Sequence, residues 1–158
     1  MKKRSSYRPR AQRPDLIFSN PIYKAFGKSP MRPDKQVDLK LAAEVAFESI
    51  QKGSATAADR DTLACIVNVA MVMAETHCSQ GDLAIAIQAQ EAMLRADGRA
   101  LLGKGWNFDG EGRQQIKAAL DMHDQQIEQL GRSAVIEALL EMQSRNDKGQ
   151  VHRIEVTA

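Results

Sequence analysis

All five prolines of this 158-residue chain lie within its first 33 residues, and no other feature constrains the fold as much. Proline removes a backbone hydrogen-bond donor and disfavours helix in the residue before it. Residues after Pro33 are free of this restriction. Aromatic residues make up only 4% of the chain, whereas alanine is abundant, which favours helix–helix packing over a β-sandwich. We therefore predict an all-α protein of one domain with an extended N-terminal arm.

The proline-containing arm has two parts. Residues 1–14 show no apolar periodicity, so we expect them to be disordered when free. Residues 16–26 contain short apolar groups that we interpret as anchors laying an extended segment across the helical body. These anchors are Leu16, Ile17, Phe18, Ile22, Tyr23 and Phe26. We divide the chain into the arm (1–33), a helical domain (34–146) and a tail (147–158) that is either a short strand or a disordered end.

Apolar residues in the helical domain recur with a period typical of α-helices. Asp34 is a candidate N-cap, Gly53 and Gly81 are candidate stop signals, and Thr56 with Asp59 has capping-box spacing. The second helix is apolar on nearly all sides, which is typical of a central helix. The pattern predicts about four helices, at residues 34–52, 56–79, 82–102 and 111–144.

The fourth predicted helix carries a heptad-like apolar seam formed by Ile116, Leu120, His123, Ile127 and Leu130. Because the seam continues across Gly131 after a slight phase shift, we favour one helix about 50 Å long. A helix of that length would overhang a compact four-helix domain and meet a second copy, so these five residues are our candidates for self-association. The alternative is two helices broken at residues 131–133.

Charge is divided between the arm and the body. Residues 1–35 carry ten Lys/Arg and two acidic residues, whereas the remainder carries 12 Lys/Arg and 18 Asp/Glu. A flexible cationic arm can pair with phosphates and stack on bases. The candidate nucleic-acid-binding residues are Lys2, Lys3, Arg4, Tyr7, Arg8, Arg10 and Arg13. The alternative is that the arm is a disordered tail that only aids solubility.

The sequence shows no catalytic or metal-binding signature. It lacks a phosphate-binding loop, a dinucleotide-binding glycine motif and a nucleophile elbow. His77 and His123 do not share a helix face with further ligands at metal-site spacing. A helix-turn-helix assignment fits poorly, because the helix that begins near Asp82 has no basic residue before Arg95. We predict no enzyme activity, no cofactor and no metal.

Cellular location can also be argued from the sequence. Cys65 and Cys78 are thirteen residues apart in one predicted helix, a separation of about 20 Å that is too long for a disulfide. We expect both thiols to be reduced, as in a reducing compartment. No secretory signal pattern follows the basic N-terminus, and the longest uncharged run, residues 62–74, is too short to span a bilayer. We therefore expect a cytoplasmic protein.

The opening residues Met1–Arg10, together with the alanine-rich stretch at Ser54–Glu75, resemble small helical accessory proteins of proteobacterial phages and plasmids. This resemblance covers about half of the chain and includes no functional motif. It implies an accessory protein of a mobile element. Proteins of that size and setting include inhibitors of host defence, among them anti-CRISPR proteins.

Three functional hypotheses follow. The first is a non-catalytic interaction protein of a phage or mobile element that binds a host protein or ribonucleoprotein complex and inhibits host defence. The second is a dimeric DNA- or RNA-binding regulator that uses its basic arm. The third is a virion or scaffold component. An enzyme ranks last.

Overall fold

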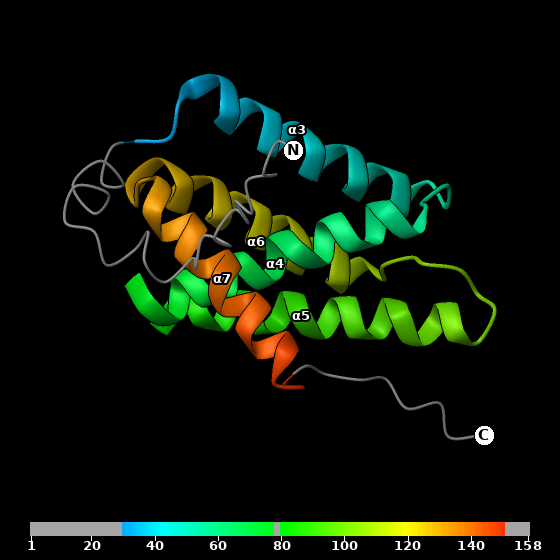
Figure 1. Cartoon of the computed structure of the whole chain (residues 1–158). Coiled ribbons are helices and arrows are strands. Elements are labelled where there is room, and N and C mark those ends of the chain that lie inside the picture. The colour runs from blue at the N-terminus through cyan, green and yellow to red at the C-terminus, as the bar shows by residue number, and fades with distance from the viewer. Residues whose placement is uncertain (1–29, 78–79, 151–158) are drawn as a thin grey trace, which may run out of the picture.

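The computed structural model describes residues 30–77 and 80–150, and within them the chain forms five α-helices and no strand (Figure 1). The helices are α3 (Pro33–Gln51), α4 (Ala57–His77), α5 (Gln80–Leu101), α6 (Gly110–Gln129) and α7 (Arg132–Asp147). The prediction of an all-α fold is confirmed for this part of the chain. Most of the predicted arm and the possible C-terminal strand lie outside the described residues.

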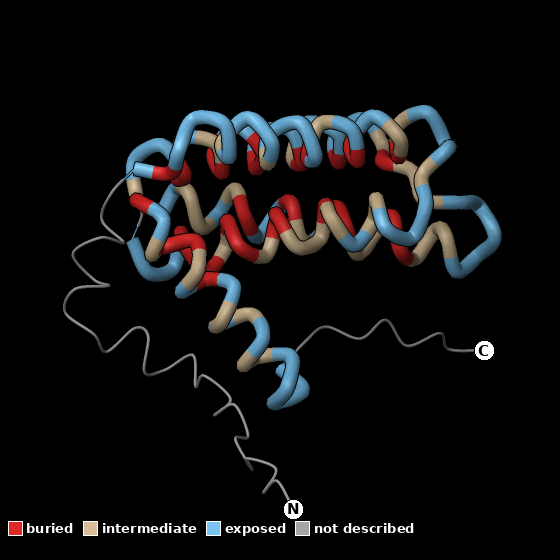
Figure 2. The backbone as a smooth tube through the Cα atoms, turned by 45° about the horizontal axis from the view of Figure 1, so that its top comes forward, coloured by how far each residue is buried: buried red, intermediate tan, exposed pale blue. Residues whose placement is uncertain are grey.

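Helix α4 is the centre of the structure, because α3, α5, α6 and α7 all pack against it. Leu63, Ala70 and Met73 of this helix have no measurable exposure to solvent. The buried side of every helix faces the interior of the bundle, while the outer side is exposed (Figure 2). The prediction that the second helix is central is therefore confirmed.

The core forms two main clusters that α4 connects. The larger cluster lies among α3, α4, α5 and α6, and it also holds Phe108 from the loop between α5 and α6. The rings of Phe47 and Phe108 lie with their centroids 6.1 Å apart. The smaller cluster joins the second half of α4 to α7 and includes Met31, which precedes α3. Met31 therefore fixes the start of the described chain to the body.

The boundary between α3 and α4 agrees with the sequence signals. Gly53 adopts a φ of 69° just after α3, a backbone conformation that glycine accepts without strain. The Thr56 backbone N–H donates to Asp59 Oδ2 at 2.8 Å, and the Asp59 N–H donates to Thr56 Oγ1 at 3.3 Å. This reciprocal pair is the predicted capping box. It fixes where α4 begins and where Arg60 lies.

Two predicted helix boundaries are wrong. Helix α3 begins one residue earlier, with Arg32 as its N-cap, and Asp34 lies in the first turn, where its carboxylate accepts from Arg32 Nε at 3.1 Å. Gly81 does not stop the second helix, because α4 ends at His77 and Gly81 lies in the first turn of α5, as does Asp82.

The single helix predicted over residues 111–144 is also wrong. Helix α6 ends at Gln129, the Leu130 N–H donates to the Gln126 carbonyl at 2.8 Å, and Gly131 adopts a φ of 46°. The chain changes direction there, and α7 crosses α4 (Figure 1). This turn buries Ala134, Val135 and Ala138 against the second half of α4, whereas a straight helix would have left them in solvent.

The start of α6 depends on a close approach to a glycine. The Asp109 side chain is the N-cap and accepts from the Gly112 N–H at 2.6 Å. A Cβ atom added to Gly112 would lie only 2.8 Å from Asp109 Oδ1. Gly98 in α5 has open space around the same position. The two glycines are therefore a matched pair for testing this cap.

We expect Gly112→Ala to lower the free energy of unfolding by about 1 kcal/mol, because the new methyl group displaces the capping carboxylate. We expect Gly98→Ala to raise it by about 0.5–1 kcal/mol, since alanine is the better helix former. Urea titrations followed by circular dichroism measure both values. Equal effects of the two substitutions would contradict the packing at Gly112.

Candidate functional site

The sequence-predicted binding residues of the arm all lie outside the described residues. This holds for Lys2, Lys3, Arg4, Tyr7, Arg8, Arg10 and Arg13. Nucleic-acid binding by the arm remains a prediction.

The residues predicted to mediate self-association lie inside the bundle. Ile116, Leu120, His123 and Ile127 of α6 are at most 4% exposed, and Leu130 is partly buried. Ile116 and Leu120 belong to the cluster with α3, α4 and α5, and Ile127 belongs to the cluster with α4 and α7. The seam is therefore used within the monomer. Dimerisation through this face would require α6 to leave the bundle.

His123 is a buried core histidine. Burial lowers the pKa of its imidazole to about 4, although Asp124 opposes part of that shift. The ring is therefore neutral at pH 7. In residues 30–77 and 80–150, no group of three or more His, Cys, Asp or Glu side chains is placed to hold a metal ion. Neither observation supports a metal or acid–base role for this histidine.

Cys65 is a half-buried thiol that packs on the cluster between α4 and α7. Burial raises its pKa, so the thiol stays protonated at neutral pH. Nucleophilic chemistry requires the thiolate. Cys78, the other cysteine of the chain, lies outside the described residues.

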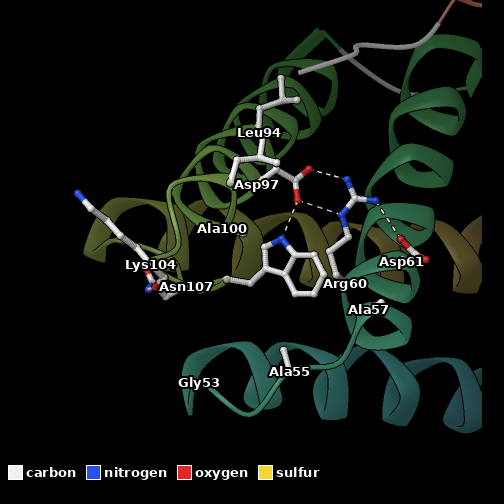
Figure 3. A pocket seen from close by; sticks show the side chains of 13 residues that line it. Gly53, Ala55, Ala57, Arg60, Asp61, Leu94, Asp97, Ala100, Lys104 and Asn107 are labelled. Carbon is white, nitrogen blue, oxygen red and sulfur yellow. Dashed lines mark hydrogen bonds and ion pairs between the residues drawn. The ribbon is translucent and has the colours of Figure 1, made fainter. Parts of the chain in front are cut away.

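A cleft lies at the end of the bundle where α3 meets α4 and α5 meets the loop before α6. Its volume is about 890 Å³ (Figure 3). Residues from four segments line it: Gly53, Ala55, Ala57, Arg60, Asp61, Leu94, Asp97, Ala100, Leu101, Lys104, Gly105, Trp106 and Asn107. Small side chains on α4 and α5 leave this space open.

A paired set of polar groups crosses the cleft. Arg60 Nε donates to Asp97 Oδ1 at 3.0 Å, and its Nη2 donates to the other carboxylate oxygen. The Trp106 indole N–H also donates to Asp97 Oδ1, at 3.1 Å. Asp61 accepts from Arg60 Nη1 at 2.9 Å on the solvent side (Figure 3). These contacts join α4, α5 and the loop in one hydrogen-bonded network.

The loop that carries Trp106 is held in place from behind. Gly103 and Gly105 adopt φ values of 74° and 70°, so the backbone turns sharply there. Arg99 donates to the Asn107 carbonyl at 2.9 Å and to the Asp109 carboxylate at 2.6 Å. The second contact and the Gly112 N–H together lower the pKa of Asp109, with the backbone N–H making the larger contribution. The indole is therefore presented on an ordered loop.

The charged groups at the centre of the cleft are engaged with one another. The hydrogen bond to Asp97 raises the pKa of Arg60, so this guanidinium cannot act as a base. Asp97 is 7% exposed and is engaged by both Arg60 and the indole N–H. What remains for a ligand is a wall of small apolar side chains, the half-buried indole, the exposed Lys104 and the exposed Leu101, with Leu102 next to it in the chain. Leu101 is 52% and Leu102 is 71% exposed.

Sequence reasoning missed this site. Arg60 and Asp97 are separated by 37 positions, and no local spacing rule joins residues so far apart. The signal available was the only tryptophan of the chain, placed between glycines in a loop. Tryptophan is seldom found in such a loop without a packing partner or a hydrogen-bond acceptor.

Comparisons with protein-family models, with curated proteins and with solved structures each find no match to this chain. In the part of the chain that the structure describes, no helix combines the length and apolar character needed to cross a bilayer.

We expect Asp97→Asn to lower the free energy of unfolding by about 2 kcal/mol, because it leaves the partly buried Arg60 guanidinium without its counter-charge. Asp61→Asn removes the exposed partner of the same arginine and should cost less than about 0.5 kcal/mol. Urea titrations followed by fluorescence measure both. Equal losses in the two variants would contradict the assigned network.

We expect the stability of the protein to fall as the pH drops from about 6.5 to about 4, in part because of His123. The unfolded histidine binds a proton near pH 6.5, whereas the folded one binds it only near pH 4. Protonation therefore favours the unfolded state across this window, by up to ~3 kcal/mol. The His123→Gln variant should show a shallower decline in urea titrations between these pH values. If the free energy of unfolding fell equally with pH in both proteins, His123 would not contribute to the decline.

Proposed function

We propose that this chain is a non-catalytic interaction protein whose helical body binds a partner protein at the cleft beside Trp106. The observation that carries this proposal is that the charged groups of the cleft are paired while apolar side chains beside them are exposed. Its central charged groups are engaged with one another, while Leu101 remains exposed among the lining residues, with the exposed Leu102 next to it in the chain. Tryptophan and arginine are enriched at the centres of protein interfaces, where water is excluded.

The occupant that suits this cleft best is an extended segment of a partner protein that inserts an aliphatic or aromatic side chain. The wall formed by Ala55, Ala57 and Ala100 offers room for such a side chain beside the paired Arg60. The indole adds a flat apolar surface of the kind that aromatic side chains stack on. A phosphate or carboxylate ligand is less suitable, because Arg60 is already paired with two carboxylates.

Charge supports a partner that is itself basic or bound to nucleic acid. The described residues carry 13 Lys/Arg and 18 Asp/Glu, a net charge of −5, while the rest of the chain carries nine Lys/Arg and two acidic residues. An acidic body repels phosphate, so the arm would make any contact with nucleic acid. A complementary basic surface on the partner would speed encounter with the body.

A host protein or ribonucleoprotein complex offers both a protein segment for the cleft and a basic surface or bound nucleic acid. The resemblance to mobile-element proteins makes a host-defence complex the proposed target. In this proposal the body occupies the protein surface and the arm contacts the nucleic acid beside it. The protein would act as an inhibitor by occupying that surface, with no reaction of its own.

The test is affinity capture of the tagged chain from host lysate with matched variants. We expect the Leu101→Gln/Leu102→Gln protein to lose its protein partner at least about tenfold, because the polar amides weaken the apolar contact at the rim. The Ile87→Gln/Leu139→Gln protein changes two other exposed apolar residues and should bind normally. A chain without residues 1–14 should keep the protein partner and lose nucleic acid.

Two results would contradict the proposal. Equal capture of the same proteins by both double variants would show that the interface lies away from the cleft. Capture of nucleic acid alone, abolished by removal of residues 1–14, would favour the DNA- or RNA-binding regulator instead.

A further inference from the structure

Helix α3 has a second apolar face that points away from the core. Val37, Leu41 and Val45 are 63%, 61% and 53% exposed, and they follow one another at intervals of four residues. The opposite side of the same helix buries Ala43, Phe47 and Ile50. The outward side of α3 is exposed along its length (Figure 2). We call the three exposed residues the α3 stripe.

The charged residues that border the α3 stripe are paired, Lys40 and Glu44 with residues of α6 and the others with local partners. The local ion pairs are Arg32–Asp34, Lys35–Asp38 and Lys52–Glu48. The border therefore offers little net charge to a ligand, and the apolar side chains are the part of this face that gains most from being covered.

We propose that residues 16–26 of this same chain cover the α3 stripe as an extended segment. This proposal concerns a different surface from the cleft beside Trp106 and does not depend on the function proposed for that cleft. Three features favour this segment as the occupant: the small size of the stripe, the position of residue 30 beside α3 and the spacing of the apolar residues in the arm.

The size of the stripe disfavours a separate molecule as its occupant. Three side chains of this exposure offer only a fraction of the ~800 Å² per partner that a stable interface between proteins buries. Their four-residue intervals also drift away from the 3.5-residue repeat of a coiled-coil seam, which disfavours a second copy of α3. A tethered segment needs less area, because its local concentration is in the millimolar range.

The described residues begin just before α3, at the end of the stripe that Val37 occupies. Met31 is 8% exposed and packs on the core, and its carbonyl accepts from Gln36 Nε2 at 2.8 Å. These contacts fix the chain beside the first turn of α3. Gly27 and Pro30 in the connection allow the backbone to reverse and run back along the helix.

The spacing of the arm anchors matches the length of the stripe. Val37 and Val45 are eight residues apart, about 12 Å along the helix axis. Ile22 and Phe26 are four residues apart, which is about 13 Å in an extended segment, and they would share one side of it. Phe26 would then lie near Val37 and Ile22 near Val45, with the segment antiparallel to α3.

Disulfide trapping in the full chain tests this placement. In a Cys65→Ala/Cys78→Ala background, the pair Ile22→Cys/Val45→Cys should form an intramolecular disulfide on mild oxidation. We expect it to form about tenfold or more faster than in the control pair Ile22→Cys/Glu91→Cys. Glu91 is exposed on α5, whose main packing partners are α4 and α6. Non-reducing electrophoresis separates the products.

Equal rates for the two pairs would overturn the proposal, because the arm would then not prefer the stripe. A disulfide between two molecules at Val45→Cys would also overturn it, in favour of a second copy on this face. Adding the Phe26→Ser change should slow the intramolecular reaction several-fold if the anchor holds the segment in place.

A second measurement uses the native cysteines, in case the cysteine-free background fails to fold. Trypsin should cut after Lys24 and Lys28 several-fold faster in Leu41→Gln than in the unmodified protein, because the weakened stripe releases the segment. Leu139→Gln replaces an exposed leucine of α7 and should leave the rate unchanged. Unchanged cleavage in Leu41→Gln would overturn the proposal independently of the disulfide result.

Discussion

The structure depends on the burial of α4 on all sides. A helix that is apolar around its whole circumference cannot face water, so it requires neighbours on every side, and α3, α5, α6 and α7 supply them. The few polar groups on its buried surface find partners across the bundle, as when Asn68 accepts from Gln90 at 2.8 Å. This requirement explains why α7 turns back at Gly131, because α7 brings Ala134, Val135 and Ala138 onto the Val69, Val72 and Met73 side of α4.

The end of the bundle that carries the cleft follows from the same packing. Helices α4 and α5 pack closely along their length and bring Arg60 opposite Asp97, where the ion pair closes the gap between them. The loop after α5 then folds over the pair, with Trp106 donating to Asp97 and Arg99 holding the loop from behind. The network leaves apolar surface at its edge, which is the basis for proposing a binding function instead of a reaction.

Sequence patterns predicted the central helix, the capping box at Thr56 and Asp59 and the stop at Gly53, because each depends on residues within one or two turns. They wrongly predicted one continuous helix across Gly131. The apolar spacing of Ile116, Leu120 and Ile127 is the same whether these residues pack on a second chain or inside their own bundle. The phase shift beyond Leu130 was the local sign that α7 buries a different face, but periodicity cannot tell a kinked helix from a turn.

The sequence by itself determined that the described chain is helical and that one helix is central, since helix periodicity and capping are local properties of the backbone and its nearest side chains. It also placed the positive charge in the arm and the negative charge in the body. Only the tertiary structure decided that the α6 seam is buried within one chain and that Arg60 meets Asp97 and Trp106. It also decided that Val37, Leu41 and Val45 stay outside. These outcomes depend on contacts between distant segments, which form only when the whole bundle packs around α4.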